Sequence, residues 1–455
     1  MKYIFLSFIL VVVSLTAKSH EISGVWFGEL NAGQSKINLI FNISEDNTGA
    51  TVCTLDSPDQ GVKNIPAQLS FLNSDSIKIN IPSFGASYEG IITKDVITGK
   101  FSQAGFDFDL NLKPGKPVIK RTQNPQPPFE YQTEEVFFTN VKDNTVLSGT
   151  LTYPVAYDNM KKGKVPVVLM VSGSGLQNRD EEILDHKPFL VIADYLAKHG
   201  IASLRYDDRS VGKSTGNAAN ATTADFMEDA AAGLEYLKKT NKFGKTGVLG
   251  HSEGGIISFM LGSRKKADFI ISLAGTGVRG DSVLVGQTKL SLLQSGMPEE
   301  LCNDYCNVLE QAYQYKIAGT SNVKDDPDTI IDKIITGTKV NIPAGARNNI
   351  INILKLNNPW LDYFMSYSPA NDISSTTCPV MALNGSLDIQ VIAGTNLNAI
   401  KKLLPQNRNN LIKEYDGLNH LFQHCTTGNP TEYGRIEETI STDVLQDITE
   451  WIKSL

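Results

Sequence analysis

The stretch Val248-Leu249-Gly250-His251-Ser252-Glu253-Gly254-Gly255 decides how this chain is interpreted. Residues 245–249 before it have the apolar character of a strand end, and residues 254–261 after it are typical of a helix start. Residues 250–254 fit G-x-S-x-G, a tight turn that projects the serine hydroxyl above a sheet. The glycines at its two ends lack β-carbons, so the strand and the helix can approach each other closely. We therefore predict that Ser252 is a nucleophile.

A serine hydroxyl needs a general base to become an effective nucleophile. His420 follows the apolar strand predicted at 411–415, in a loop that can reach Ser252. His424 is an alternative base one helical turn further on. A metal site at these two histidines is also conceivable, but no third ligand is evident, so we expect no metal and no cofactor. His420 is our candidate base.

The base needs a carboxylate that fixes its tautomer and stabilises the imidazolium. The G-x-S-x-G turn is called a nucleophile elbow. In chains that have it, the acid normally lies between the serine and the histidine in sequence, directly after a strand. Asp388 fits best, because it follows the buried strand predicted at 378–383. Asp416, which precedes Gly417, is more typical of a turn. We expect a catalytic triad of Ser252, Asp388 and His420.

Backbone amides must stabilise the oxyanion that develops during acyl transfer. The N–H of Glu253, at the predicted helix N-terminus, is one candidate donor. A second should come from the glycine-rich loop 172–181, where we expect the region of Gly175 and Leu176 to supply it. Three polar residues in the same loop either fix its shape or bind substrate: Asn178, Arg179 and Asp180.

The composition is that of a globular protein, with 41% hydrophobic and 20% charged residues in a chain of 455. This length predicts two or three domains. The formal net charge is −7, and no dense Lys/Arg block occurs, so a nucleic-acid partner is not expected. The motif Gly212-Lys213-Ser214 is similar to part of a phosphate-binding loop, but Asp207 occupies the place of its first glycine, so we predict a turn held by Asp/Arg pairs.

The N-terminal residues 1–19 predict a signal peptide. Lys2 supplies the positive start, Ile4 to Val13 the apolar run, and Ala17-Lys18-Ser19 the cleavage site. An uncleaved anchor is the alternative, but the run is too short for a comfortable membrane span. We expect a secreted or periplasmic protein with no membrane span in the mature chain and a net charge of about −9.

Residues 20–113 are predicted to form an all-β domain, because short stretches such as Lys36–Ile43 and Ser76–Ile81 alternate with period two. A small barrel or sandwich is expected, with no catalytic cluster in it. Residues 114–129 are rich in proline and predict an extended linker.

Residues 130–455 alternate strands and helices, which predicts an α/β domain with a mostly parallel sheet covered on both faces. Helices are expected over 183–198 and 436–455, among others. Residues 280–375 interrupt the alternation with mainly helical sequence. An insertion at this sheet edge is expected to lie over the nucleophile as a lid, and a peripheral helical subdomain is the alternative.

The chain contains five cysteines, an odd and sparse set that does not form a disulfide framework. The pairs Cys302/Cys306 and Cys378/Cys425 are conceivable bridges, but i,i+4 spacing on a helix is poor disulfide geometry. We expect mostly free thiols.

Residues 130–455 resemble the α/β-hydrolases of the secreted bacterial esterase type, preceded here by the β domain. The resemblance rests on 171–175 with the following Asn-Arg-Asp-Glu, on Arg205–Arg209, on the elbow, and on Gly417–Phe422. Ser172 departs from the pattern, since many relatives carry histidine there, and so does Ser210, where Asp-x-Arg-Gly is common. The family implies a triad at Ser252, Asp388 and His420, and it also resembles serine exopeptidases of the prolyl-oligopeptidase and aminopeptidase kind.

The function expected from these residues is metal-independent hydrolysis of carboxylic esters with short acyl groups. One alternative is an aminopeptidase, in which Asp180, Glu181 and Glu182 recognise a free amino terminus. Another is a binding protein on a hydrolase scaffold. The natural substrate and the oligomeric state are not determined by the sequence.

Overall fold

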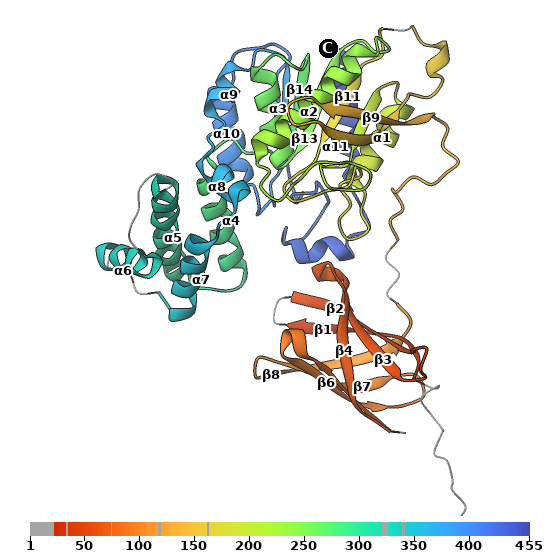
Figure 1. Cartoon of the computed structure of the whole chain (residues 1–455), viewed down its shortest axis with the longest axis vertical. Coiled ribbons are helices and arrows are strands. Elements are labelled where there is room, and N and C mark those ends of the chain that lie inside the picture. Colours follow the sequence, from red (N-terminus) through yellow and green to blue (C-terminus); the bar gives the residue numbers. More distant parts are fainter. Residues whose placement is uncertain are drawn as a thin grey trace, which may run out of the picture. The chain divides into compact units, whose positions relative to one another are not determined.

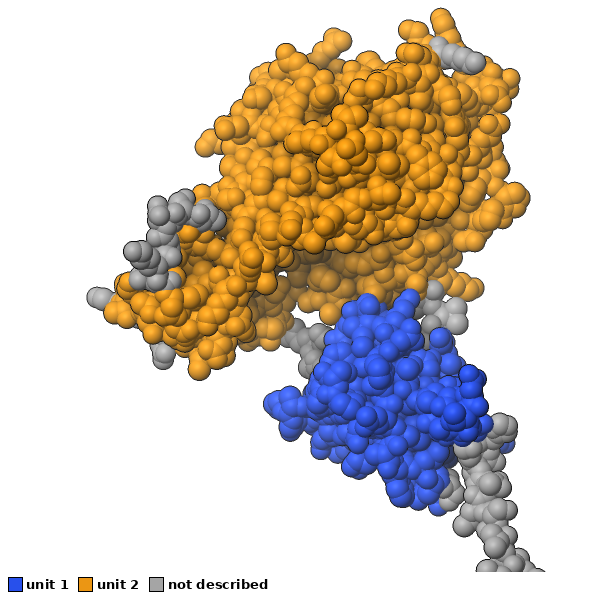
Figure 2. All heavy atoms as spheres, viewed as in Figure 1, with its two compact units in different colours: residues 1–119 blue, residues 120–455 orange. Residues whose placement is uncertain are grey.

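The computed structural model describes residues 22–32, 35–73, 75–116, 120–161, 163–319, 326–338, 340 and 342–455. The predicted signal peptide lies outside the described residues. The chain forms two compact units, residues 1–119 and residues 120–455, which are coloured separately in Figure 2. Each unit is described by itself.

Unit 1 is a closed antiparallel barrel of eight strands in sequential order, which β8 closes by pairing with β1. The strands are β1 Gly24–Ala32, β2 Ser35–Glu45, β3 Thr51–Ser57, β4 Val62–Leu72, β5 Ser76–Ile81, β6 Ala86–Ile92, β7 Ile97–Gln103 and β8 Phe106–Pro114, with short 3-10 turns at Pro58–Gln60 and Pro82–Phe84. The predicted β domain is therefore a barrel and not a sandwich.

The barrel core follows from the period-two pattern of its strands. In β5, Ile77, Ile79 and Ile81 point inward and are buried, while the residues between them are more exposed. These side chains pack with Phe41 and Tyr88 in one apolar cluster. Alternation places every second side chain on one face of a strand, so this sequence pattern fixes which face is inside.

The segment that begins unit 2 includes part of the predicted linker. The guanidinium of Arg121 donates hydrogen bonds to the backbone carbonyls of Leu184 and Gly434, both at 2.9 Å. The amide of Gln123 donates to the carbonyl of Ile440 at 2.8 Å. Arg121 and Gln123, which the sequence assigns to the linker, are therefore bound to other parts of unit 2.

Unit 2 is built on an eight-stranded sheet in the order β16-β15-β14-β13-β11-β12-β10-β9. Figure 1 labels β9, β11, β13 and β14 of this sheet. The strands are β9 Thr133–Asn140, β10 Thr145–Thr152, β11 Val167–Val171, β12 Ala202–Tyr206, β13 Thr246–His251, β14 Phe269–Leu273, β15 Val380–Gly385 and β16 Leu411–Tyr415. β9, β10 and β12 pair antiparallel, and β11 to β16 pair parallel. The mostly parallel sheet agrees with the prediction.

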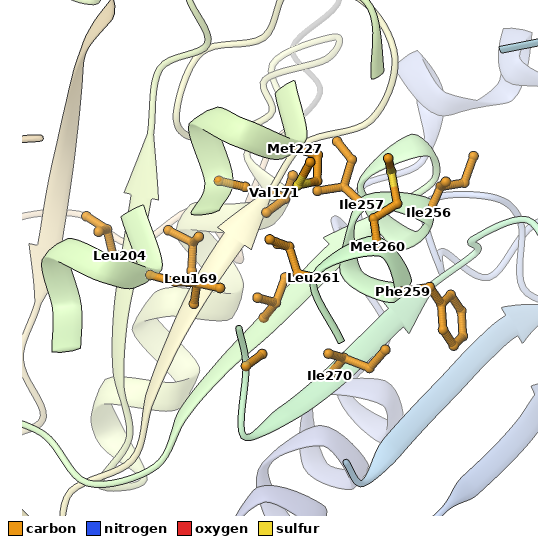
Figure 3. Packing of buried hydrophobic residues seen from close by; sticks show 14 of the residues in the cluster. Leu169, Val171, Leu204, Met227, Ile256, Ile257, Phe259, Met260, Leu261 and Ile270 are labelled. Atoms are coloured by element: carbon orange, nitrogen blue, oxygen red, sulfur yellow. The ribbon is translucent and has the colours of Figure 1, made fainter. Parts of the chain in front are cut away.

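Helices cover both faces of this sheet, and its central strand β11 is apolar at every position. In β11, Val167, Leu169 and Val171 contribute to the cluster on one face, and Val168 and Met170 to the cluster on the other. Figure 3 shows the first cluster, where side chains of the helix after β13 pack on strand residues. A strand buried on both faces needs such a continuous apolar run.

The helices outside the insertion are α1 Pro188–Lys198, α2 Thr223–Lys239, α3 Glu253–Ser263, α10 Ala393–Leu403 and α11 Thr442–Ser454, with 3-10 turns at Tyr157–Asn159 and Pro430–Arg435. Two predicted helix starts are wrong. Leu184 and Asp185 have positive φ in a tight turn, so α1 begins only at Pro188. The backbone of Thr439 and Ile440 is bound by Gln123, and α11 begins after Ser441.

The predicted insertion between β14 and β15 is helical. Its helices are α4 Gly280–Gln294, α5 Glu299–Gly319, α6 Pro327–Thr338, α7 Ala344–Lys355, α8 Pro359–Ser366 and α9 Ala370–Ser375. The sequence analysis missed α8 and α9, which are short. α5, α6 and α7 share a small core that includes Val308, Ile331 and Ile350.

Two findings complete the description of the fold. All five cysteines lie in described residues, and none of them is in a disulfide. Within the described ranges, no helix has both the length and the apolar character that crossing a lipid bilayer requires.

Candidate active site

Ser252 lies at the sharp turn between β13 and α3. Its φ of 53° and ψ of −113° are a conformation that residues other than glycine rarely adopt. Its N–H donates to the carbonyl of Leu273 in the neighbouring strand β14, at 2.8 Å. A neighbouring strand therefore stabilises the strained backbone of this turn, as is common where an unfavourable conformation positions a functional side chain.

The two glycines around Ser252 are required by close backbone approach. A β-carbon on Gly250 would overlap the carbonyl oxygen of Gly254. A β-carbon on Gly254 would overlap the carbonyl oxygen of Val171 at the end of β11. This is the approach of strand and helix that the sequence pattern predicts.

His420 and Asp388 meet in the loops that follow β16 and β15. Nδ1 of His420 lies 2.7 Å from Oδ2 of Asp388, and both side chains are buried. The other oxygen of Asp388 accepts the N–H groups of Gln390 and Val391, at 2.8 and 2.9 Å. A carboxylate held in this way orients the imidazole, with Nδ1 as donor and Nε2 left as the basic nitrogen.

The loop that carries His420 is shaped by its buried neighbour Asn419. The side-chain oxygen of Asn419 accepts the N–H groups of Leu421 and Gln423, both at 3.0 Å. The ring of His420 lies 4.7 Å from the ring of His251, the residue directly before Ser252. The structure thus brings the candidate base to the elbow.

The candidate oxyanion donors lie around a small cavity. Glu253 is the first residue of α3, where backbone N–H groups have no partner within the helix. Gly175 also lines this cavity, with a positive φ of 92°, together with Gly173, whose β-carbon position would be 3.2 Å from Cβ of Ser252. The side chain of Leu176 is about half exposed, and Leu176 is not among the lining residues.

The polar residues predicted to fix the loop or bind substrate make contacts within the fold. Arg179 pairs with Asp207 at 2.6 Å, and its guanidinium also donates to the hydroxyls of Thr150 and Ser148. Asp180 pairs with Arg205. The side chain of Asn178 accepts the backbone N–H groups of Asp180 and Glu182. These contacts favour the loop-fixing alternative.

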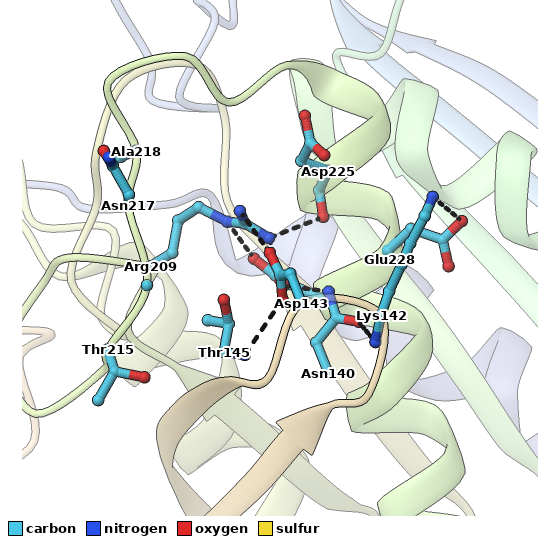
Figure 4. Close-up of polar contacts among 12 residues, drawn as sticks. Asn140, Lys142, Asp143, Thr145, Arg209, Thr215, Asn217, Ala218, Asp225 and Glu228 are labelled. Atoms are coloured by element: carbon cyan, nitrogen blue, oxygen red, sulfur yellow. Dashed lines mark hydrogen bonds and ion pairs between the residues drawn. The ribbon is translucent and has the colours of Figure 1, made fainter.

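The stretch 205–214 forms a turn held by ion pairs. Arg209 pairs with the buried Asp229 at 2.8 Å. It also pairs with Asp143 at 3.1 Å (Figure 4). Lys213 pairs with Glu135, at 2.8 Å. The lysine of the phosphate-loop-like motif is therefore engaged elsewhere, and the predicted Asp/Arg turn is present.

Asp208, in the same turn, is a buried carboxyl beside the glycine-rich loop. It accepts the hydroxyl of Ser172 and the N–H of Gln177, at 3.1 and 2.8 Å. The pKa of Asp208 is raised to about 7, mainly by burial and also by the charges of Glu253 and Glu181, against the lowering effect of these hydrogen bonds. Ser172 thus anchors the glycine-rich loop to Asp208.

The helical insertion contacts the elbow through α8. The indole N–H of Trp360 donates to the carboxyl of Glu253 at 2.8 Å, and the hydroxyl of Thr223 donates to the same oxygen at 2.6 Å. Burial raises the pKa of Glu253, although these two hydrogen bonds lower it. The end of α4 is tied by Gln294 to the carbonyl of Thr427, in the loop after His420, at 2.7 Å. Two parts of the insertion, α8 and the end of α4, therefore contact residues around the candidate site.

The remaining described histidines have other roles. His199 caps the C-terminus of α1, as expected. His424 is exposed and bound to Glu438 at 2.9 Å. His186 is buried beside Thr439 and Tyr433, and burial lowers its pKa to about 4. Among the described residues, no group of three or more His, Cys, Asp and Glu side chains is arranged to hold a metal ion.

Sequence reasoning missed two contacts of the site. It considered Glu181 only as an amine-binding residue, whereas the structure buries it against His251, at 3.0 Å, and Gly173. It assigned no partner to His251, which the structure places between Glu181 and the carbonyl of His420. The histidine inside the elbow and the acidic end of the loop 172–181 are the only sequence signals for this pair, because the partners are 70 residues apart.

Comparison with known proteins adds two sequence matches. Residues 187–295 match the family described as serine aminopeptidase, S33. Esterase EstD of Thermotoga maritima is 26% identical over 315 residues, which cover 68% of this chain and 67% of that protein.

Solved structures with a similar arrangement include esterase Pf2001 of Pyrococcus furiosus, with a TM-score of 0.41 and 16% identity over 75% of this chain and 98% of that one. Proline iminopeptidase of Mycobacterium smegmatis has a TM-score of 0.41 and 12% identity over 70% and 98%. Both TM-scores are below 0.5, so the fold of unit 2 is assigned from its sheet topology and from the two sequence matches. The eight-stranded, mostly parallel sheet and the elbow after β13 give unit 2 an α/β-hydrolase fold, and the two sequence matches show that the chain is similar to a serine aminopeptidase family and to an esterase.

Proposed function

We propose that this protein hydrolyses carboxylic esters with short acyl groups through Ser252, His420 and Asp388. The observation that carries the proposal is the 2.7 Å contact between His420 and Asp388. The ring of His420 also lies beside the ring of His251, the residue before Ser252 in the elbow. The similarity to an enzyme named as an esterase supports an ester substrate.

In the proposed reaction, Nε2 of His420 accepts the proton of Ser252 as Oγ attacks the ester carbonyl. The N–H of Glu253 and a second amide near Gly175 stabilise the oxyanion. The alcohol leaves with the proton from His420, and an acyl-serine remains. Water then gives a proton to His420 and attacks the acyl-serine, which releases the acid and returns the proton to Ser252.

Short acyl groups are proposed because the cavity near the elbow is small. Its lining includes Tyr206, Phe226 and Ile257, which leave little room beside Gly173 and Glu253. The amine site needed by an aminopeptidase is less well supported. Asp180 is paired with Arg205, and Glu181 is buried against His251.

The test uses p-nitrophenyl esters from acetate to palmitate beside aminoacyl p-nitroanilides, with wild-type protein and Ser252→Ala. We expect ester turnover that falls with acyl length and drops by several orders of magnitude in the variant. Near-wild-type turnover of Ser252→Ala would overturn the proposal. Anilide turnover equal to ester turnover would favour a peptidase.

We also propose that the protein is exported after removal of residues 1–19. Lys2 and the apolar run Ile4 to Val13 support this proposal. Expression in a secreting bacterial host should give protein outside the cytoplasm whose N-terminal residue is His20, as measured by mass spectrometry. An intact Met1 on the exported protein would contradict the cleavage.

A further inference from the structure

Beneath the elbow, both ring nitrogens of His251 face oxygen atoms. Nδ1 lies 3.0 Å from Oε1 of Glu181, and Nε2 lies 2.9 Å from the backbone carbonyl oxygen of His420. A carbonyl oxygen only accepts hydrogen bonds, and so does an ionised carboxylate. With Glu181 ionised, each nitrogen must carry a hydrogen, which makes the ring an imidazolium.

His186 provides the contrast within the same unit. It is also buried, but its Nδ1 lies 3.0 Å from the hydroxyl of Thr439, which can donate a hydrogen bond. Its Nε2 lies 2.9 Å from the carbonyl of Tyr433. A neutral ring satisfies both of these contacts, in agreement with the lowered pKa of His186. His251 has no such donor.

Glu181 joins His251 to the glycine-rich loop. The same oxygen that faces His251 accepts the N–H of Gly173, at 2.6 Å. Glu181 is buried and has a φ of 50°, a left-handed conformation that is uncommon for this residue type. The local fold thus holds the backbone of Glu181 in an unfavourable conformation while its carboxylate reaches both partners.

The charged surroundings of His251 favour its protonated form. Burial lowers the pKa of His251, but the charge and hydrogen bond of Glu181, the carbonyl of His420 and the charge of Asp388 outweigh this effect, so the pKa is raised. The ring of His420 lies 4.7 Å away. The small cavity beside His251 is otherwise lined by apolar residues: Pro188, Phe189, Ile192, Leu273, Leu421, Phe422 and Ile440.

We propose that Glu181 and a protonated His251 form a positioning ion pair that holds the glycine-rich loop and the backbone of His420 in place on either side of Ser252. This inference rests on the proposed function, since it assigns a role in that reaction. Neither residue touches the reacting atoms in this role. If His251 loses one proton, one of its ring nitrogens has no hydrogen but still faces an oxygen that accepts hydrogen bonds. That contact is lost, so either the glycine-rich loop or the loop of His420 is no longer held in place.

The first test measures the protonation of His251 directly. Protein labelled with ¹⁵N-histidine is titrated by NMR, and His251→Gln assigns the signal. We expect both nitrogens of His251 to be protonated in the wild type at pH 7, and Glu181→Gln to lower the titration midpoint by at least about one pH unit. A neutral His251 ring at pH 7 overturns the proposal.

The second test measures kcat and KM against pH for the ester that the wild type hydrolyses best. For Glu181→Gln we expect kcat to fall about 10- to 100-fold, as the loss of a hydrogen bond between charged groups predicts, with little change in KM. The alkaline limb of the profile should move to lower pH. Glu181→Asp keeps the charge and should restore the position of that limb, even if kcat stays reduced.

The matched control is Glu438→Gln, which removes the carboxylate from the exposed pair with His424. Its kcat and pH profile should equal those of the wild type. The proposal is overturned if Glu181→Gln, folded by circular dichroism, behaves like this control. An active Ser252→Ala would end the proposed function, while the NMR titration would still decide the protonation of His251.

Discussion

The carboxylate of Asp388 lies 2.7 Å from Nδ1 of His420, and its second oxygen is held by two backbone N–H groups. The pair is buried, so the imidazole has one orientation and one favoured tautomer. The contact joins loops that follow two neighbouring parallel strands, β15 and β16.

Asp388→Asn should reduce kcat on the order of 10⁴-fold, because an amide donating to Nδ1 leaves the proton on the wrong nitrogen. The melting temperature should change little, since Asn can still accept the two backbone N–H groups. Asp416→Asn is the control, because Asp416 contacts only Ser386 in the same region. Equal loss of activity in both variants would contradict the assignment of Asp388.

Gly250→Ala should prevent folding or destabilise the protein by about 3 kcal/mol or more, because the β-carbon overlaps the carbonyl oxygen of Gly254. Urea unfolding monitored by circular dichroism measures the change. Gly394→Ala is the control, since Gly394 lies in α10 with open space around its β-carbon position. A Gly250→Ala protein as stable as the wild type would show that the turn has room for a β-carbon at this position.

Trp360→Phe should lower kcat/KM about five- to tenfold, corresponding to the loss of ~1 kcal/mol from one hydrogen bond. The ring can still stack on Phe364, but Glu253 loses a partner at the start of α3. Trp451→Phe is the control, because it removes the hydrogen bond that the indole of Trp451, in α11, donates to the carbonyl of Asn409. If both variants keep full activity, the contact between insertion and elbow does not support catalysis.

Asp208 should make the protein less stable as pH rises from about 4 to about 7. Its pKa is raised in the folded state, so the folded protein binds more protons in this window than the unfolded chain does. Asp208→Asn should therefore gain stability relative to the wild type with rising pH, by up to about 1.4 kcal/mol per pH unit. Urea unfolding at pH 5 and pH 8 gives the difference.

Ser172→Ala controls for this experiment, because it removes a hydrogen-bond partner of Asp208 and keeps the titrating carboxyl. Its stability should follow the same trend with pH as that of the wild type. A constant difference between Asp208→Asn and the wild type would show that Asp208 does not titrate in this range.

The strands and the elbow could be predicted because their signals are local. β11 is apolar at every position, which a strand buried on both faces requires, and β5 alternates as a barrel strand does. The glycines at 250 and 254 mark a turn within five residues. The helix starts at Pro188 and Thr442 could not be read in this way, because the residues before them are held by partners far away in the sequence.

The sequence by itself determined the fold class, the candidate nucleophile and the residue types of a triad, because periodicity and short motifs act within one element. Only the tertiary structure decided which side chains meet. Glu181 reaches His251 across 70 residues, and Trp360 reaches Glu253 across 107. The free energy of such contacts depends on burial and on the geometry of donors and acceptors, which exist only once the sheet, the loops and the insertion are packed together.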